Sequence, residues 1–76
     1  MAAPADDREF VFTRADFERV RVLIRERAGI ALTDAKQNMV YSRVSRRLRA
    51  RGIRTFAQYL ALLESDDGPE WEAFTN

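Results

Sequence analysis

Five arginines crowd the stretch MVYSRVSRRLRARG, which runs from Met39 to Gly52. Guanidinium groups bind phosphate and carboxylate oxygens through a planar fork of N–H donors. The wider segment from Thr33 to Arg54 holds seven cations and the single acid Asp34, whereas the rest of the chain holds six basic and eleven acidic residues. Because the positive charge is concentrated in one segment of a chain whose net charge is only +1, we infer a surface that binds an anionic partner.

The composition excludes several other kinds of chemistry. The chain has no cysteine and no histidine, so a disulfide scaffold and the usual zinc sites are excluded, and its carboxylates are not grouped as metal ligands. The N-terminal sequence MAAPADDREF has acids where a secretory signal would be apolar. No apolar run approaches the roughly 20 residues that span a bilayer. We therefore expect a cytoplasmic protein without membrane insertion.

Helices must position the arginines, because apolar residues recur at helical spacing and no strand pattern of useful length is present. The chain of 76 residues suffices for one small domain. We predict an all-α fold, a small bundle of three helices plus the start of a fourth. The domain is expected over residues 13–76, after a flexible leader over residues 1–12.

The first helix is predicted from about residue 14 to about residue 28. Thr13 can cap it, with Asp16 completing a capping-box-like arrangement, and Gly29 is a plausible left-handed stop. The second helix is predicted to begin at a cap formed by Thr33 or Asp34 and to end before Gly52. Apolar residues on one side of these two helices define their buried faces: Phe17, Val20, Leu23 and Ile24 in the first, and Val40, Val44 and Leu48, with Tyr41 beside them, in the second.

The third helix opens with a T-x-x-Q capping box, Thr55 to Gln58. Its buried face is predicted to contain Phe56, Tyr59, Leu60 and Leu63. The sequence SDDGP ends this helix, and Pro69 suits the first position of a fourth helix.

A helical wheel of the second helix places the cations in one band on its surface. Lys36, Arg43 and Arg47 fall along one edge of the buried stripe, and Arg46 and Arg49 continue the band toward the exposed side. Solvated arginines that cover apolar surface with their stems are the simpler interpretation. However, like charges three or four residues apart disfavour the helix, and this helix has no acid after Asp34 to offset them, so we favour a binding face. Both nucleic acid and an acidic protein surface fit as partners, although a sequence pI of about 8.3 is modest for a DNA-binding domain.

The chain from residue 29 to residue 76 resembles the N-terminal domain of the bacterial chemotaxis receptor methyltransferases, the CheR family. The resemblance rests on four motifs that occur in order: a G-I-x-L turn, a K-x-x-x-V-Y-x-R-V-x-R-R-L-R helix, a G-I-x-x-F-x-x-Y-L helix and an E-W-x-x-F-T-N segment. The likeness extends back through the first helix.

This resemblance implies that the parent enzyme transfers a methyl group from S-adenosylmethionine to glutamate side chains of chemoreceptors. It also implies that the basic second helix faces the acidic methylation helices of the receptor. The candidate receptor-contacting residues are then Lys36, Arg43, Arg46, Arg47 and Arg49.

In such enzymes the last motif leads into a T-T-N linker and an α/β domain that binds the cofactor, and this domain is the helical domain's other implied partner. We expect the α/β domain to be absent from these 76 residues, which have no glycine-rich loop. The segment alone is therefore expected to hold no catalytic, cofactor-binding or metal-binding residue. A freestanding basic module that binds nucleic acid or a regulatory anionic ligand is the alternative.

The aromatic residues are expected to serve packing rather than ligand binding. We assign Phe17, Phe56, Tyr59 and Trp71 to the core or to an interface between domains. The short fourth helix leaves room for Trp71 and Phe74 to be exposed in this segment and covered by the second domain in a full enzyme. Tyr41 suits either the core margin or the contact surface.

Overall fold

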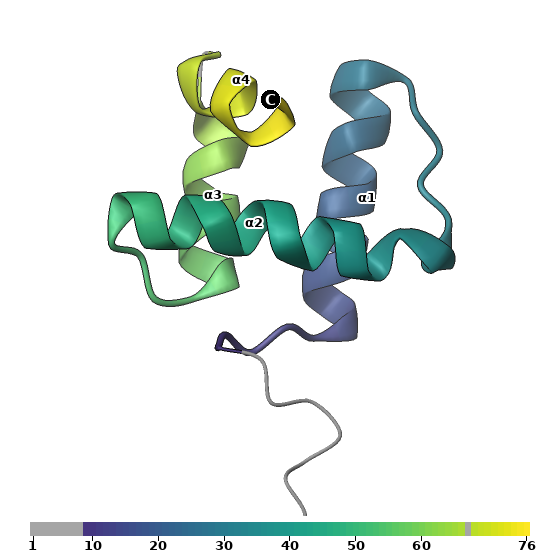
Figure 1. Cartoon of the computed structure of the whole chain (residues 1–76). Coiled ribbons are helices and arrows are strands. Elements are labelled where there is room, and N and C mark those ends of the chain that lie inside the picture. The colour runs from purple at the N-terminus through teal and green to yellow at the C-terminus, as the bar shows by residue number, and fades with distance from the viewer. Residues whose placement is uncertain (1–8, 67) are drawn as a thin grey trace, which may run out of the picture.

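The computed structural model describes residues 9–66 and 68–76, and within these ranges the chain is helical with no strand. The helices are α1 (Arg14–Ala28), α2 (Gln37–Arg51), α3 (Phe56–Ser65) and α4 (Pro69–Thr75), and a single 3-10 turn, η1 (Asp34–Lys36), precedes α2. Helix α2 lies across both α1 and α3, and α4 folds back toward α2 from the top of α3 (Figure 1). The predicted all-α bundle with a short fourth helix is confirmed.

Local signals place the ends of α1 as predicted. The Thr13 hydroxyl accepts the Asp16 N–H at 3.1 Å, and the Asp16 carboxylate accepts the Thr13 N–H at 3.0 Å, which completes a capping box. Gly29 ends the helix with φ of 69°, a left-handed conformation that glycine adopts without steric cost. At α3 the Thr55 hydroxyl accepts the Gln58 N–H at 3.1 Å, which is one of the two hydrogen bonds of the predicted capping box.

The start of α2 differs from the prediction. Neither Thr33 nor Asp34 caps it through a side chain, because the chain first makes the 3-10 turn, in which the Lys36 N–H donates to the Thr33 carbonyl oxygen. The Asp34 carboxylate instead lies 3.1 Å from both Arg14 and Arg21 of α1. Asp34, which the local sequence predicts as a helix cap, thus forms ion pairs with another helix instead.

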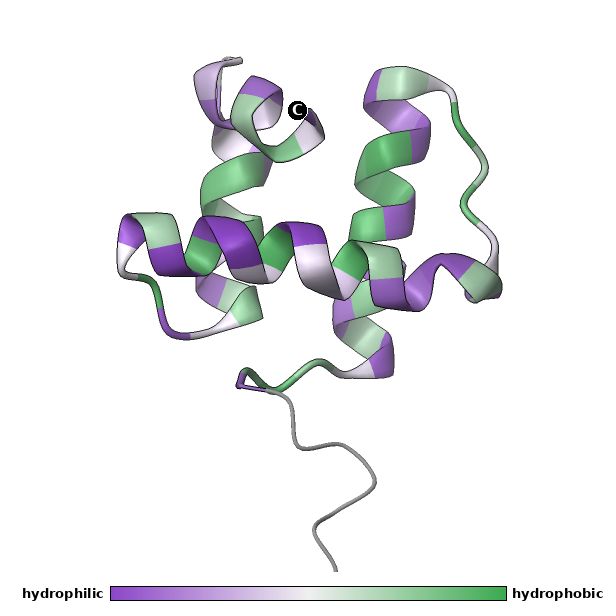
Figure 2. Ribbon diagram, viewed as in Figure 1, coloured by the Kyte–Doolittle hydropathy of each residue, from purple (hydrophilic) through white to green (hydrophobic). Residues whose placement is uncertain are grey.

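The core lies where the three longer helices meet. Hydrophobic and hydrophilic residues alternate along α2 (Figure 2), and its Val40, Val44 and Leu48 are buried in the core together with residues of α1 and α3. Every residue predicted for the three buried faces lies in this core, and Phe74 of α4 joins them. Tyr41 is half-buried and stacks on Phe56 at 5.7 Å between ring centroids, so it belongs to the core margin.

Residues 9–12 contact the helical unit, although the sequence predicts them as part of a flexible leader. The Phe10 N–H donates to the Tyr41 hydroxyl at 3.0 Å, and the Phe12 ring lies 4.9 Å from the Phe56 ring. Burial of an aromatic ring against an apolar surface is favourable in free energy. Phe10 and Phe12 therefore pack on the helices. Residues 1–8 of the predicted leader lie outside the described residues.

Candidate functional site

The five cations predicted as contacts lie on η1 and α2, but they differ in exposure. Lys36, Arg46 and Arg49 are exposed, whereas Arg43 and Arg47 are half-buried. We use the name arginine face for the solvent side of α2 that carries Arg43, Arg46 and Arg49, with Lys36 at its start. The contacts of these residues differ from one end of the face to the other.

The guanidinium groups of Arg43 and Arg46 bind the C-terminal end of α4. Arg43 Nη1 donates to the Thr75 carbonyl oxygen at 2.9 Å, and Arg46 Nη2 donates to the Ala73 carbonyl oxygen at 3.1 Å. The last carbonyl groups of a helix have no partner inside the helix and carry partial negative charge. Because a guanidinium group has five N–H donors, both side chains keep donors for an outside anion.

Arg47 belongs to a buried polar cluster centred on Glu70, which is only 3% exposed. Arg47 donates to both Glu70 carboxylate oxygens, from Nε at 2.7 Å and from Nη2 at 3.1 Å, and Arg51 Nη1 donates at 3.0 Å. The Tyr59 hydroxyl donates to Glu70 Oε2 at 2.5 Å. A carboxylate with this many charged and polar donors is stable in the interior, so the head of Arg47 is held by a structural partner.

The protonation of this cluster follows from its contacts. The hydrogen bonds from Arg47 lower the pKa of Glu70 to about 2, although burial opposes them. The same bonds raise the pKa of Arg47. Burial, together with the bond to Glu70, raises the pKa of the Tyr59 hydroxyl well above its ordinary value. The cluster therefore holds an ionised glutamate, a cationic arginine and a neutral tyrosine across the neutral pH range.

The pairing of Glu70 with Arg47 is not predicted from the sequence. Sequence spacing reveals ion pairs only between residues three or four apart on the same helix. Glu70 is 23 residues from Arg47 along the chain. One signal is present in the sequence: Glu70 stands four residues before Phe74, so it shares the buried side of α4.

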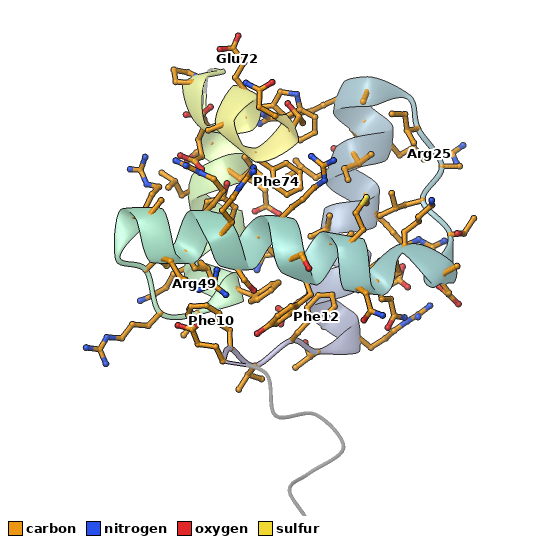
Figure 3. All side chains as sticks on the ribbon, in the orientation of Figure 1. Phe10, Phe12, Arg25, Arg49, Glu72 and Phe74 are labelled. Carbon is orange, nitrogen blue, oxygen red and sulfur yellow. The ribbon has the colours of Figure 1, made fainter. Side chains whose placement is uncertain are left out.

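Arg49 contacts the N-terminal segment. Its Nε donates to Glu9 Oε1 at 2.7 Å, and its guanidinium group lies 6.0 Å from the centre of the Phe10 ring (Figure 3). Lys36, by contrast, has no ion-pair partner among the described residues. At one end of the arginine face Lys36 therefore has no ion-pair partner among the described residues, and at the other end Arg49 is paired with Glu9.

The pair of aromatic residues on α4 corrects a prediction. Phe74 is 2% exposed and belongs to the core, so the expectation that it lies open to solvent is wrong. Trp71 is half-buried, and the Arg27 guanidinium group lies 5.4 Å from its ring centre. The physical reason is that Glu70 of α4 is ion-paired with Arg47 of α2, and Phe74, four residues later on the same side of α4, is therefore buried as well. Figure 3 shows the Phe74 side chain between α4 and α2.

Asp66 fixes the other end of α4. Its Oδ2 accepts the N–H groups of Gly68 at 2.7 Å, Glu70 at 3.0 Å and Trp71 at 3.3 Å. These backbone donors lower the pKa of Asp66 against the opposing effect of desolvation.

Other kinds of site have no support in residues 9–66 and 68–76. No group of three or more potential ligand side chains is placed to hold a metal ion there. None of the helices in these ranges combines the length and hydropathy of a membrane span.

Comparison with known proteins identifies the family. Residues 15–76 match the family model described as "CheR methyltransferase, all-alpha domain". The chain is 56% identical over 63 residues to the chemotaxis protein methyltransferase of Klebsiella aerogenes, and the alignment covers 82% of this chain and 22% of the relative. It is 52% identical over 63 residues to the chemotaxis protein methyltransferase of Escherichia coli, and this alignment also covers 82% of this chain and 22% of the relative.

A more distant relative aligns over a longer stretch. The chemotaxis protein methyltransferase 2 of Pseudomonas aeruginosa is 41% identical over 70 residues, which are 92% of this chain and 25% of the relative. The chain thus spans about a quarter or less of the length of these curated relatives. Because the family model matches most of its residues, the chain belongs to the family of CheR methyltransferase all-alpha domains.

Proposed function

We propose that this chain is the receptor-recognition domain of a bacterial chemotaxis methyltransferase that acts in the cytoplasm. In this proposal the enzyme transfers a methyl group from S-adenosylmethionine to glutamate side chains of chemoreceptors. The observation that carries the proposal is the family match over residues 15–76. The names of the relatives, chemotaxis protein methyltransferases, support the reaction class.

The receptor contact is proposed for the arginine face. Lys36, Arg46 and Arg49 are exposed, and Arg43 keeps free donors beside its bond to α4. Acidic methylation helices carry the carboxylates that such a row of cations binds, and complementary charge speeds association and sets orientation. Arg47 has an indirect role in this proposal. Its bond to Glu70 fixes the position of α4, and the carbonyl groups of α4 in turn orient Arg43 and Arg46.

We assign methyl transfer to another domain of such an enzyme. The three glycines of this chain stand singly at Gly29, Gly52 and Gly68, each at a helix end. They do not form the glycine-rich loop that holds a nucleotide-like cofactor, so these residues do not fit S-adenosylmethionine. The cofactor-binding domain of the enzyme is the second proposed partner.

Binding measurements with two polyanions test the receptor proposal. We expect the chain to bind a glutamate-rich helical peptide that has the sequence of a receptor methylation segment, and to bind it less tightly as salt rises. Lys36→Glu and Arg46→Glu should each weaken that binding about tenfold, because each reverses an exposed cation on the face. Arg54→Glu is the matched control, since Arg54 is an exposed cation outside the face.

Duplex DNA serves as the competing ligand. Tight DNA binding without any response to the peptide would overturn the proposal in favour of a nucleic-acid-binding module. Circular dichroism of each variant separates lost binding from lost folding.

A further inference from the structure

An open groove of about 330 Å³ lies beside the arginine face, between the end of α1, the start of α2 and α4. Its walls are largely apolar and include Leu32, Met39, Trp71 and Phe74. Among the described residues, four large hydrophobic side chains are exposed, and two of them, Ile30 at 54% and Met39 at 36%, line this groove. Apolar side chains gathered in a concave site indicate a surface that another molecule covers.

The charges around the groove restrict the partner. Lys36 and Arg43 are the charged residues among those described that line it, and no acid joins them. The hollow between α1 and the end of α3, in contrast, is lined by Glu18, Glu26 and Glu64 as well as by arginines. A partner for the groove must therefore combine an apolar side chain with nearby carboxylates.

The spacing of the cations indicates a helix as that partner. Lys36, Met39, Arg43 and Arg46 follow one another at i, i+3, i+7 and i+10, so they share one side of η1 and α2. A second hollow along the same side is lined by Met39, Arg43 and Arg46 and continues the groove. Lys36 and Arg43 are separated by about 10 Å along the helix axis, which is also the separation of two glutamates seven residues apart on a partner helix.

We propose that the groove receives an apolar side chain from an amphipathic acidic helix, whose glutamates seven residues apart bind Lys36 and Arg43. The inference rests on the proposed function, and it adds that the recognised helix is selected by an apolar anchor as well as by charge. The apolar anchor lies three or four residues after the first glutamate, facing Met39. Burial of one leucine-sized side chain is enough to change affinity by tenfold or more.

Two synthetic helical peptides of equal net charge test this inference. Both carry glutamates seven residues apart, and one has leucine between them where the other has glutamine. We expect the leucine peptide to bind about ten times more tightly to the full chain. Trp71 is the chain's only tryptophan and lines the groove, so the leucine peptide should also shift its fluorescence emission to shorter wavelength, and the glutamine peptide should not.

A pair of uncharged variants locates the anchor site. Met39→Gln should remove the preference for leucine and leave the affinity for the glutamine peptide unchanged. Val22→Gln is the matched control, because Val22 is another exposed hydrophobic residue but does not line the groove. It should keep the tenfold preference.

The outcomes distinguish this inference from the function on which it rests. Equal binding of both peptides, with both affinities reduced by Lys36→Glu, overturns the groove inference and leaves receptor recognition in place. Binding of neither peptide overturns both. Concentration-dependent dimerisation that Met39→Gln abolishes would assign the groove to a second copy of the chain and so overturn the inference as well.

Discussion

The Glu70 carboxylate accepts hydrogen bonds from Arg47, Arg51 and Tyr59 while almost none of it reaches solvent. An isolated ion in that position would be strongly unfavourable, and the arrangement is stable because every carboxylate oxygen has a charged or hydroxyl donor. The energetic consequence is asymmetric: the cluster contributes little in excess of good apolar packing, but removing the buried carboxylate leaves its donors without a partner.

Glu70→Ala is therefore expected to destabilise the fold by about 3 kcal/mol or more, since it leaves Arg47 and the Tyr59 hydroxyl without their partner. Urea unfolding followed by circular dichroism measures the change. Glu72→Ala is the control, because Glu72 is an exposed acid on the same helix, and it should change stability by less than about 0.5 kcal/mol. Equal effects of the two substitutions would contradict the structural role of Glu70.

Ser45 presents the opposite case at the residue scale. It is fully buried in α2, and its hydroxyl oxygen has no hydrogen-bond partner among the described residues. Ser45→Ala removes an unsatisfied polar group and raises helix propensity, so we expect about 1 kcal/mol of added stability. Thermal unfolding measures this directly, and a loss of stability would mean that the hydroxyl has a partner in solution.

Helix α4 shows how an element depends on its surroundings. Its seven residues are too few to form a stable helix in isolation. Asp66 binds the N–H groups at its start, Glu70 and Phe74 hold its inner side, and Arg43 and Arg46 bind its last carbonyl groups. The arginine face and α4 are therefore mutually dependent, because the helix orients the two guanidinium groups that complete it.

The turn between α2 and α3 gives a prediction for an element boundary. Gly52 ends α2 with φ of 69°, and a Cβ atom added there would meet no neighbouring atom within 4 Å. Any cost of Gly52→Ala must then come from the backbone conformation alone, and we expect about 1 kcal/mol of lost stability. Gly52→Asn should cost less, since asparagine tolerates this conformation better. Urea unfolding of both variants tests the order, and a larger loss for asparagine would contradict it.

At the scale of the whole molecule, acid stability reflects the Glu70 cluster. The pKa of Glu70 is about 2 in the fold and 4.5 ordinarily. Because the folded-state pKa is lowered, the stabilisation is complete above about pH 5 and is lost as the pH falls toward about 2. Glu70→Gln should be less stable at neutral pH, but its stability should fall less between these limits.

Urea midpoints measured across this pH range test the prediction. Glu72→Gln should reproduce the wild-type pH dependence, because that side chain is exposed. Parallel pH profiles for the wild type and Glu70→Gln would show that Glu70 does not govern acid unfolding.

The helices and the buried faces were predictable because their signals are short-range. The Thr13 capping box, the glycine stops at Gly29 and Gly52, and the apolar spacing each act within one or two helical turns. The family resemblance is equally legible in the sequence, and the match over residues 15–76 confirms it. The receptor contacts remain a proposal.

The sequence by itself determined which segments become helices, which sides they bury and that α2 carries an excess of cations. The tertiary structure alone decided what those cations contact: Glu70 for Arg47, Glu9 for Arg49, and the carbonyl groups of α4 for Arg43. It also decided that Phe74 is buried and that an apolar groove opens beside the exposed cations. The physical reason is that these contacts join groups 23 to 40 residues apart, and only the packing of the helices brings such groups together.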